Sequence, residues 1–171
     1  VLRPDHTTPI ARIVSTRLDH DLPKKLYYHD PVFRKDPLLG ESEIFQFGCE
    51  HIGELALSDE VQIIRMVLDI CHQIGLNDIE IHVAHPELFQ TLTDDELDAL
   101  SKGDLSQLSD LPKKGGESLV AEYSYLSPFF VNVRDLNLSN VYVNFGLYKD
   151  LSYYNGLFFD IVSPTFGKVI G

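Results

Sequence analysis

Cations are scarce in this sequence. It holds 14 Lys and Arg against 26 Asp and Glu in 171 residues, which gives a formal net charge of -12. A surface that binds nucleic acid neutralises phosphates with clustered Lys and Arg. The charge balance therefore argues against a nucleic-acid partner, although a local basic patch can exist on an acidic protein.

Cysteines and long apolar runs are scarce as well. Cys49 and Cys71 are too few for a disulfide framework, so we expect both to be buried thiols in a reducing, cytoplasmic protein. No apolar run approaches the 18 residues that a membrane-spanning helix needs, and no charged-then-apolar signal opens the chain. We therefore expect no contact with a membrane.

A starting Met is also missing. The chain opens on Val1 and stops at Gly171, just after an apolar run, so we expect a piece of a longer protein. With 44% hydrophobic and 23% charged residues, the composition fits one globular domain or part of one. We expect residues 1–171 to form a single, partial domain. Residues 101–118, rich in Ser, Gly, Asp and Lys, are predicted to be a mobile excursion from it.

The segment from Pro31 to Gly53 has the most informative pattern. It predicts a short strand ending at Arg34, a turn, and a second strand over 44–52, which together form an antiparallel hairpin. Alternation along the second strand places Gln46, Gly48 and Glu50 on one face and aromatic residues on the other. A polar face with a gap at Gly48 suits a small polar ligand.

The remaining elements follow from periodicity and capping signals. Thr8 and Pro9 predict a helix start, and Ser127-Pro128 repeats that signal. The predicted helices cover 9–18, 59–74, 94–100 and 129–136, with one short helix from 85 to 92. The predicted strands cover 78–83, 141–145 and 153–162.

Two groups of polar residues could be mistaken for metal sites. His82 and His85 are separated by two residues, but one falls in a predicted strand and the other before Pro86. We therefore interpret them as a strand residue and a helix cap rather than as zinc ligands. The acidic run at 94–98 is interpreted as a solvated helix face. No metal, cofactor or catalytic residue is expected.

At this point the residues resemble a known family. The segment at Pro31 is similar to motif 2 of a class II aminoacyl-tRNA synthetase, and specifically of histidyl-tRNA synthetase, with Arg34 at the motif's arginine. Gln46-x-Gly48-x-Glu50 resembles the pattern that holds the histidine substrate. The matches at the two ends are Leu2-Arg3-Pro4-Asp5-His6-Thr7, similar to L-R-P-E-x-T, and Leu151-Ser152-Tyr153-Tyr154-Asn155-Gly156, similar to L-D-Y-Y-T-G.

The resemblance implies a fold and a binding site. The fold class would be α+β, that of a class II synthetase catalytic domain, with a mostly antiparallel sheet flanked by helices. The ligand would be L-histidine, which offers an ammonium, a carboxylate and an imidazole. Whether Glu50 would bind the imidazole or the ammonium stays open. The implied histidine-binding residues are Asp5, Thr7, Arg34, Gln46, Glu50, Tyr153 and Tyr154.

Two departures from the synthetase pattern bear on activity. Lys149 stands where the synthetase has an arginine that acts in activating the amino acid, and lysine lacks the arginine fork. Between Asp36 and Phe45 the chain has Glu41 and Glu43 and no arginine to grip ATP. Two carboxylates beside a triphosphate would repel it, by on the order of 1 kcal/mol or more each at close range.

An amino-acid site without a nucleotide site is what the regulatory subunit of ATP phosphoribosyltransferase, a paralogue of the synthetase, would show. The sequence from Leu2 to Arg12 also resembles that subunit. Its likeness implies a non-catalytic protein of histidine biosynthesis that binds the catalytic subunit, as a homo-oligomer within a hetero-oligomer, and responds allosterically to histidine. The alternatives are a divergent histidyl-tRNA synthetase that activates histidine with ATP, and a synthetase-like scaffold of another pathway.

Overall fold

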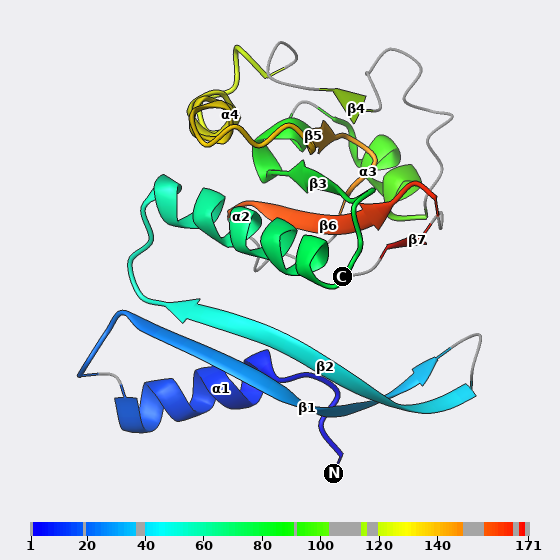
Figure 1. The fold of residues 1–171 in the computed structure, drawn as a ribbon. Helices are drawn as coiled ribbons and strands as arrows, with labels where there is room; N and C mark the ends of the chain where they lie inside the picture. Colours follow the sequence, from blue (N-terminus) through cyan, green and yellow to red (C-terminus); the bar gives the residue numbers. More distant parts are fainter. Residues whose placement is uncertain are drawn as a thin grey trace. The chain divides into compact units, whose positions relative to one another are not determined.

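The fold is described from a computed structural model, which covers residues 2–18, 20–36, 40–90, 92–102, 114–115, 120–148, 156–165 and 168–169. The chain divides into two compact units, Val1–Ala56 and Leu57–Gly171, and each is described by itself (Figure 1). The expectation of a single domain over 1–171 stays a prediction.

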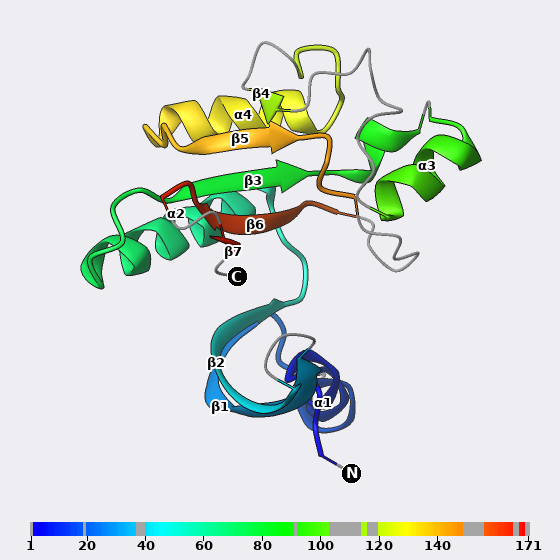
Figure 2. The ribbon, with the colours of Figure 1, turned by 90° about the vertical axis from the view of Figure 1, so that its right-hand side faces the viewer.

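The first unit is a long β-hairpin with a helical segment. Helix α1 (Thr7–Ile13) continues into a short π-helix, η1 (Val14–Leu18). Strands β1 (Lys24–Asp36) and β2 (Gly40–Ile52) pair antiparallel along their whole length, and the hairpin curves around α1 (Figure 2). The predicted hairpin is confirmed, and its first strand begins earlier than the sequence pattern indicated.

The hairpin has a covered face and an open face. Register pairs Val32 with Ile44 and Tyr28 with Gly48, so even-numbered residues of both strands share one face. On that face Val32 is fully buried, and on η1 Val14 is buried as well. The opposite face exposes its large side chains, among them Tyr27, Phe45 and Phe47.

The second unit is a five-stranded sheet in the order β4-β5-β3-β6-β7. The pair β3–β5 is parallel and the other neighbours are antiparallel, so the mostly antiparallel α+β class is confirmed. Helices α2 and α4 lie on one face of the sheet (Figure 2). The elements are α2 (Leu57–Gln73), β3 (Glu80–Ala84), η2 (Pro86–Phe89), α3 (Asp94–Ser101), β4 (Lys114–Gly115), α4 (Leu126–Asp135), β5 (Val141–Asn144), β6 (Phe158–Ser163) and β7 (Lys168–Val169).

One apolar core holds this second unit together. Ile81 and Val83 of β3 are fully buried and belong to the same cluster as Ile64 of α2 and Phe129 of α4. Burying a large aliphatic or aromatic side chain stabilises a fold by roughly 1.5–3 kcal/mol. The alternate residues Glu80 and His82 lie on the other face of β3 and are only partly buried.

Three helix starts depend on capping groups, and two of them differ from the predictions. Thr93, directly before the predicted helix 94–100, caps α3 in a reciprocal capping box with Glu96. Helix α1 begins at Thr7, so the prediction of Thr8 as N-cap is wrong, because the Asp5 carboxylate accepts the Thr8 N–H instead. Helix α4 begins at Leu126, before Ser127-Pro128, because its first N–H groups are capped by a residue from another element.

Gly75 ends α2 with φ at +88°, as its C-cap role requires.

Part of the predicted pattern lies outside the described residues. Of the excursion predicted at 101–118, residues 114–115 form the edge strand β4, and residues 103–113 and 116–119 lie outside the description. The predicted strand over 153–162 is described from 156 onward, with β6 beginning at Phe158.

Candidate functional site

The covered face of the hairpin carries three of the predicted ligand-binding residues. Arg34 lies on β1, and Gln46 and Glu50 lie on β2, all at even-numbered positions of the paired register. Gln46 and Glu50 are half-buried, and Arg34 is exposed. The sheet therefore presents an amide, a carboxylate and a guanidinium in one direction.

The segment before α1 crosses this face and is tied to it by two arginines. Arg34 donates its Nε–H to the carbonyl of Pro4 at 2.6 Å. Arg3 donates its Nε–H to the carbonyl of Pro31 at 2.8 Å and forms an ion pair with Asp30 at 3.1 Å. A guanidinium has five N–H donors, so the bond to Pro4 leaves Arg34 with capacity for an anionic ligand.

Two further predicted residues reach the face through that segment. Thr7 donates its hydroxyl to Oε1 of Glu50 at 2.8 Å, although 43 positions separate the two residues. Asp5 accepts the backbone N–H of Thr8 at 2.8 Å, and this bond is the main reason that the pKa of its carboxyl lies below the ordinary value. Asp5 is thus held ionised at neutral pH while it caps α1.

Five of the seven predicted residues are therefore placed within the first unit. Tyr153 and Tyr154 lie outside the described residues, and so does Lys149. The structure gives no position for the tyrosines relative to the hairpin, and their role stays a prediction.

The gap expected above Gly48 is filled by a side chain of the hairpin itself. A Cβ placed on Gly48 would lie 2.3 Å from the hydroxyl oxygen of Tyr28, its partner on β1. The expectation that Gly48 leaves open room for a ligand is therefore wrong in this conformation. An aromatic ring laid over a strand glycine is a known way to cover its bare backbone. Tyr28 was missed because only the strand register reveals it, although the sequence contains both partners.

The open face of the hairpin corrects a second expectation. Cys49 is exposed rather than buried, because its odd-numbered position turns it away from the covered face, whereas Cys71 is buried in the second unit. Partial burial, followed by the nearby Glu50 carboxylate, raises the pKa of the Cys49 thiol. Cys49 is therefore a protonated thiol at neutral pH.

In the second unit, His82 is a half-buried residue of β3 and belongs to a chain of hydrogen-bonded polar side chains. Asn144 accepts the Gly146 N–H at 2.9 Å through Oδ1, so its amide NH2 faces Nδ1 of His82 at 3.1 Å. That nitrogen must then accept, and Nε2 donates to Glu80 at 2.9 Å. Both ring nitrogens are engaged, which explains this strand histidine without a metal.

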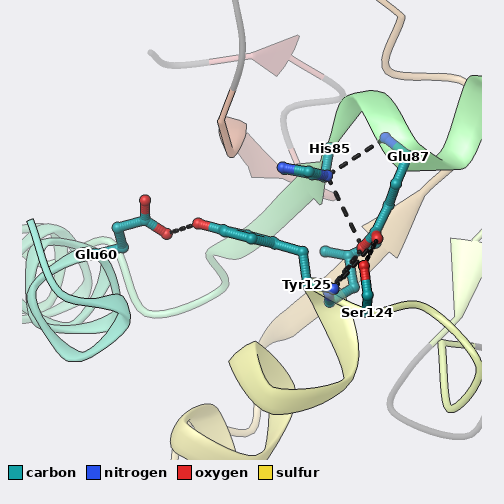
Figure 3. A network of polar contacts seen from close by, with 6 residues as sticks. Glu60, His85, Glu87, Ser124 and Tyr125 are labelled. Atoms are coloured by element: carbon teal, nitrogen blue, oxygen red, sulfur yellow. Dashed lines mark hydrogen bonds and ion pairs between the residues drawn. The ribbon is translucent and has the colours of Figure 1, made fainter.

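His85 belongs to a second polar network, around Glu87 (Figure 3). His85 caps η2 by accepting the Glu87 N–H, and its ring stacks on Tyr125 with centroids 4.0 Å apart. Burial lowers the pKa of His85, so its contact with the Glu87 carboxylate at 3.8 Å is not a charged pair at neutral pH. The predicted roles of His82 in a strand and His85 as a cap are confirmed.

Glu87 and Tyr125 connect three elements in the same network. The Glu87 carboxylate accepts the N–H groups of Tyr125 and Leu126 at 3.2 and 2.8 Å and the Ser124 hydroxyl at 3.1 Å. The Tyr125 hydroxyl donates to Glu60 of α2, and burial raises the pKa of that hydroxyl strongly. The donors and acceptors of this network are paired with one another, so we interpret it as a structural connection between η2, α4 and α2.

Two other kinds of feature are absent from the described part of the chain. Within it, no group of three or more His, Cys, Asp or Glu side chains is arranged to hold a metal ion. None of the helices in the same ranges is both long and apolar enough to cross a lipid bilayer.

Comparison with known sequences shows which family the chain belongs to. Residues 1–121, which include both strands of the hairpin, match the sequence model of the family described as Histidyl-tRNA synthetase. The chain belongs to the histidyl-tRNA synthetase family. The resemblance of the Pro31 segment to motif 2 is thus supported by a match over most of the chain.

Two curated relatives of this histidyl-tRNA synthetase family member are named differently from the family model. An ATP phosphoribosyltransferase regulatory subunit from a Thermoanaerobacter species is 34% identical over 124 residues, which cover 71% of this chain and 32% of the relative. One from Carboxydothermus hydrogenoformans is 26% identical over an alignment that covers 99% of this chain and 66% of the relative. The chain spans about a third of the length of the first of these relatives.

Solved structures show the fold of the family. A protein from Bacillus halodurans, titled as an ATP phosphoribosyltransferase regulatory subunit/histidyl-tRNA synthetase, gives a TM-score of 0.81 at 21% identity over 98% of this chain and 55% of that one. The ATP phosphoribosyl transferase (HisG:HisZ) complex from Thermotoga maritima gives 0.70 at 14% identity, covering 99% and 73%. The class II synthetase-like fold expected from the sequence is confirmed.

Proposed function

We propose that the full-length protein is a non-catalytic, histidine-binding regulatory subunit of ATP phosphoribosyltransferase, the enzyme of the first step of histidine biosynthesis. The observation that carries this proposal is the bond between Thr7 and Glu50, which joins two separate predicted motifs on one face of the hairpin. The names of the curated relatives support the same assignment.

The charges of this face match the charges of free histidine. Asp5 and Glu50 supply anions for the ligand ammonium or an imidazole N–H, and Arg34 supplies a cation for its carboxylate. Glu50 already accepts from Thr7, and an ionised carboxylate has further lone pairs for a ligand donor. Gln46 adds an amide on the same face, and Tyr153 and Tyr154 remain proposed hydroxyl donors.

Regulation follows if histidine binds one arrangement of the complex with the catalytic subunit better than another. A ligand with equal affinity for both arrangements would shift neither population. The proposal therefore requires the differential affinity and not merely the binding of histidine.

A divergent histidyl-tRNA synthetase is the second candidate, because the matching family model carries that description. Against it stands the sequence between Asp36 and Phe45, with Glu41 and Glu43 and no arginine. An ATP triphosphate would meet repulsion there rather than attraction.

Calorimetric titration of the full-length protein with L-histidine tests the proposal. We expect saturable binding, and Glu50→Gln should weaken it by about 10-fold or more, because hydrogen bonds to charged groups are worth about 1.5–3 kcal/mol. Glu54→Gln, which removes an exposed carboxylate beyond the hairpin, should leave the affinity unchanged.

Two outcomes would contradict the proposal. Absence of any histidine binding would overturn both the regulatory subunit and the synthetase. Rapid histidine-dependent exchange of pyrophosphate into ATP would overturn the regulatory subunit in favour of the enzyme.

A further inference from the structure

Tyr28 lies at the centre of the covered face of the hairpin. A Cβ on Gly48 would approach its hydroxyl oxygen to 2.3 Å and its Cζ to 2.4 Å, so the outer end of the side chain lies directly against the glycine. A side chain at position 48 would displace the ring. Gly48 therefore fixes where the Tyr28 hydroxyl lies, between Gln46 and Glu50 along β2.

His6 holds the same ring from the segment that crosses the face. Its imidazole stacks on Tyr28 with centroids 4.3 Å apart and an interplanar angle of 29°. His6 is only 5% exposed, and its Nε2 lies 3.0 Å from the carbonyl oxygen of Asp30. The Tyr28 ring is thus positioned by a buried histidine and by the bare backbone of Gly48.

The hydroxyl that this arrangement positions lies among the charged groups of the predicted site. Glu50, Arg34 and Asp5 all act on it electrostatically, and burial followed by the Glu50 charge raises its pKa. The hydroxyl is therefore neutral at physiological pH and can both donate and accept. Among the residues that the structure describes, it has no hydrogen-bond partner.

Covering a glycine explains the ring of Tyr28 but not its hydroxyl. A phenylalanine ring would cover Gly48 equally well. It would also avoid placing a hydroxyl on a face that carries two carboxylates. A phenol hydroxyl gains most where it meets a hydrogen-bond partner. A bound amino acid attracted by Asp5 and Glu50 would bring N–H donors to this position.

We propose that Tyr28 is a further ligand-contacting residue of this face, whose hydroxyl accepts a hydrogen bond from an N–H group of the bound amino acid while His6 and Gly48 position its ring. The inference rests on the proposed binding of histidine. It adds a contact that depends on the cross-strand pairing of Tyr28 with Gly48.

Tyr28→Phe tests the contact, because it removes the hydroxyl and keeps the ring over Gly48. In calorimetry with L-histidine, we expect the variant to bind about 5- to 20-fold more weakly, the range for a hydrogen bond of about 1–1.8 kcal/mol. Its melting temperature should stay close to that of the parent protein. The matched control is Tyr27→Phe, since Tyr27 is 81% exposed on the opposite face, and its affinity should not change.

A double-mutant cycle tests the positioning role of His6. His6→Ala should weaken binding several-fold in the parent protein and much less in the Tyr28→Phe background, because the hydroxyl that it positions is then absent. A merely structural histidine would cost the same in both backgrounds.

The outcomes separate the two levels of the argument. If the parent protein binds histidine and Tyr28→Phe binds it equally well, the contact is overturned while the proposed function stands. Equal costs of His6→Ala in the two backgrounds would overturn the positioning role. If the parent protein binds no histidine, the proposed function fails, and the contact fails with it.

Discussion

Asp78 shows how one carboxylate can hold a chain reversal in place. It accepts the Ser163 hydroxyl at 2.8 Å and the Thr165 N–H at 3.2 Å, which ties the approach to β3 to the end of β6. The Thr165 and Ser163 bonds hold the pKa of the Asp78 carboxyl below its ordinary value of 3.8. Because the folded-state pKa is depressed, the stabilisation is present above the unfolded-state pKa of 3.8 and is lost as the pH falls through the folded value.

Asp78→Asn should therefore destabilise the protein at pH 7 and much less at pH 3. Urea unfolding at the two pH values measures the difference in midpoint between the variant and its parent. Asp135→Asn, at the exposed end of α4, is the control, and its midpoint should change little at either pH. An equal loss for Asp78→Asn at both pH values would contradict the role of the ionised carboxylate.

Residue identities predicted the charged part of the candidate site better than its shape. Strand alternation placed Gln46 and Glu50 on one face, and the structure joins Thr7 to Glu50 there. Tyr28 and His6 escaped prediction because their roles arise from register and from a chain crossing. Alternation along one strand reports the face of a residue, but not its neighbour on the next strand.

Helix α4 illustrates the same point at the scale of an element. The Ser127-Pro128 signal predicts a start at residue 129, three residues too late, because the cap comes from η2 rather than from the preceding residues. Proline is tolerated in the first turn, where its missing N–H has no intrahelical partner to lose. The capping group, Glu87, lies about 40 positions earlier in the sequence, beyond the reach of local pattern rules.

Glu87→Ala should cost about 1–2 kcal/mol of unfolding free energy, the range for loss of an N-terminal helix cap. It would leave the N–H groups of Tyr125 and Leu126 and the hydroxyl of Ser124 without their acceptor. Chemical denaturation followed by circular dichroism measures the loss. The unfolding free energy of Glu87→Gln should lie between those of the parent protein and Glu87→Ala, because the amide oxygen of Gln can still accept a hydrogen bond.

Glu54→Ala removes an exposed glutamate and serves as the control for the change of charge. A free energy of unfolding for Glu87→Ala that matches this control would show that the carboxylate does not stabilise α4.

Elements with strong periodicity were predictable, and elements held by distant partners were not. The length of α2, its end at Gly75 and the capping box of α3 follow from nearby residues. The central place of β3 in its sheet, between a parallel and an antiparallel neighbour, follows from pairing with strands far along the chain.

At the scale of the whole molecule, the proposed function concerns assembly. Mixed with the short catalytic subunit of ATP phosphoribosyltransferase, the full-length protein should coelute with it in size-exclusion chromatography. The complex should show transferase activity that L-histidine inhibits. Glu50→Gln should raise the inhibitory histidine concentration by about 10-fold or more, in line with the loss of a charged hydrogen bond.

The control for assembly is Glu54→Gln, whose complex should respond to histidine as the parent does. Separate elution of the two proteins at concentrations well above those of the assay would contradict the proposed partner. Inhibition of the isolated catalytic subunit by the same histidine concentration would contradict the proposed sensor.

The register of the hairpin also bears on the order in which the chain acquires structure during synthesis. Its pairs run outward from Asp36–Gly40 at the turn to Lys24–Ile52 at the open end. Once the pair nearest the turn has formed, each further pair orders only a few additional residues. The further loss of chain entropy is therefore small. In contrast, β3 must wait for Val141 and Ile161, which pair with Ile81. A nascent chain can therefore form the hairpin, with its polar face, before the ribosome has synthesised β5 and β6, the strands that pair with β3.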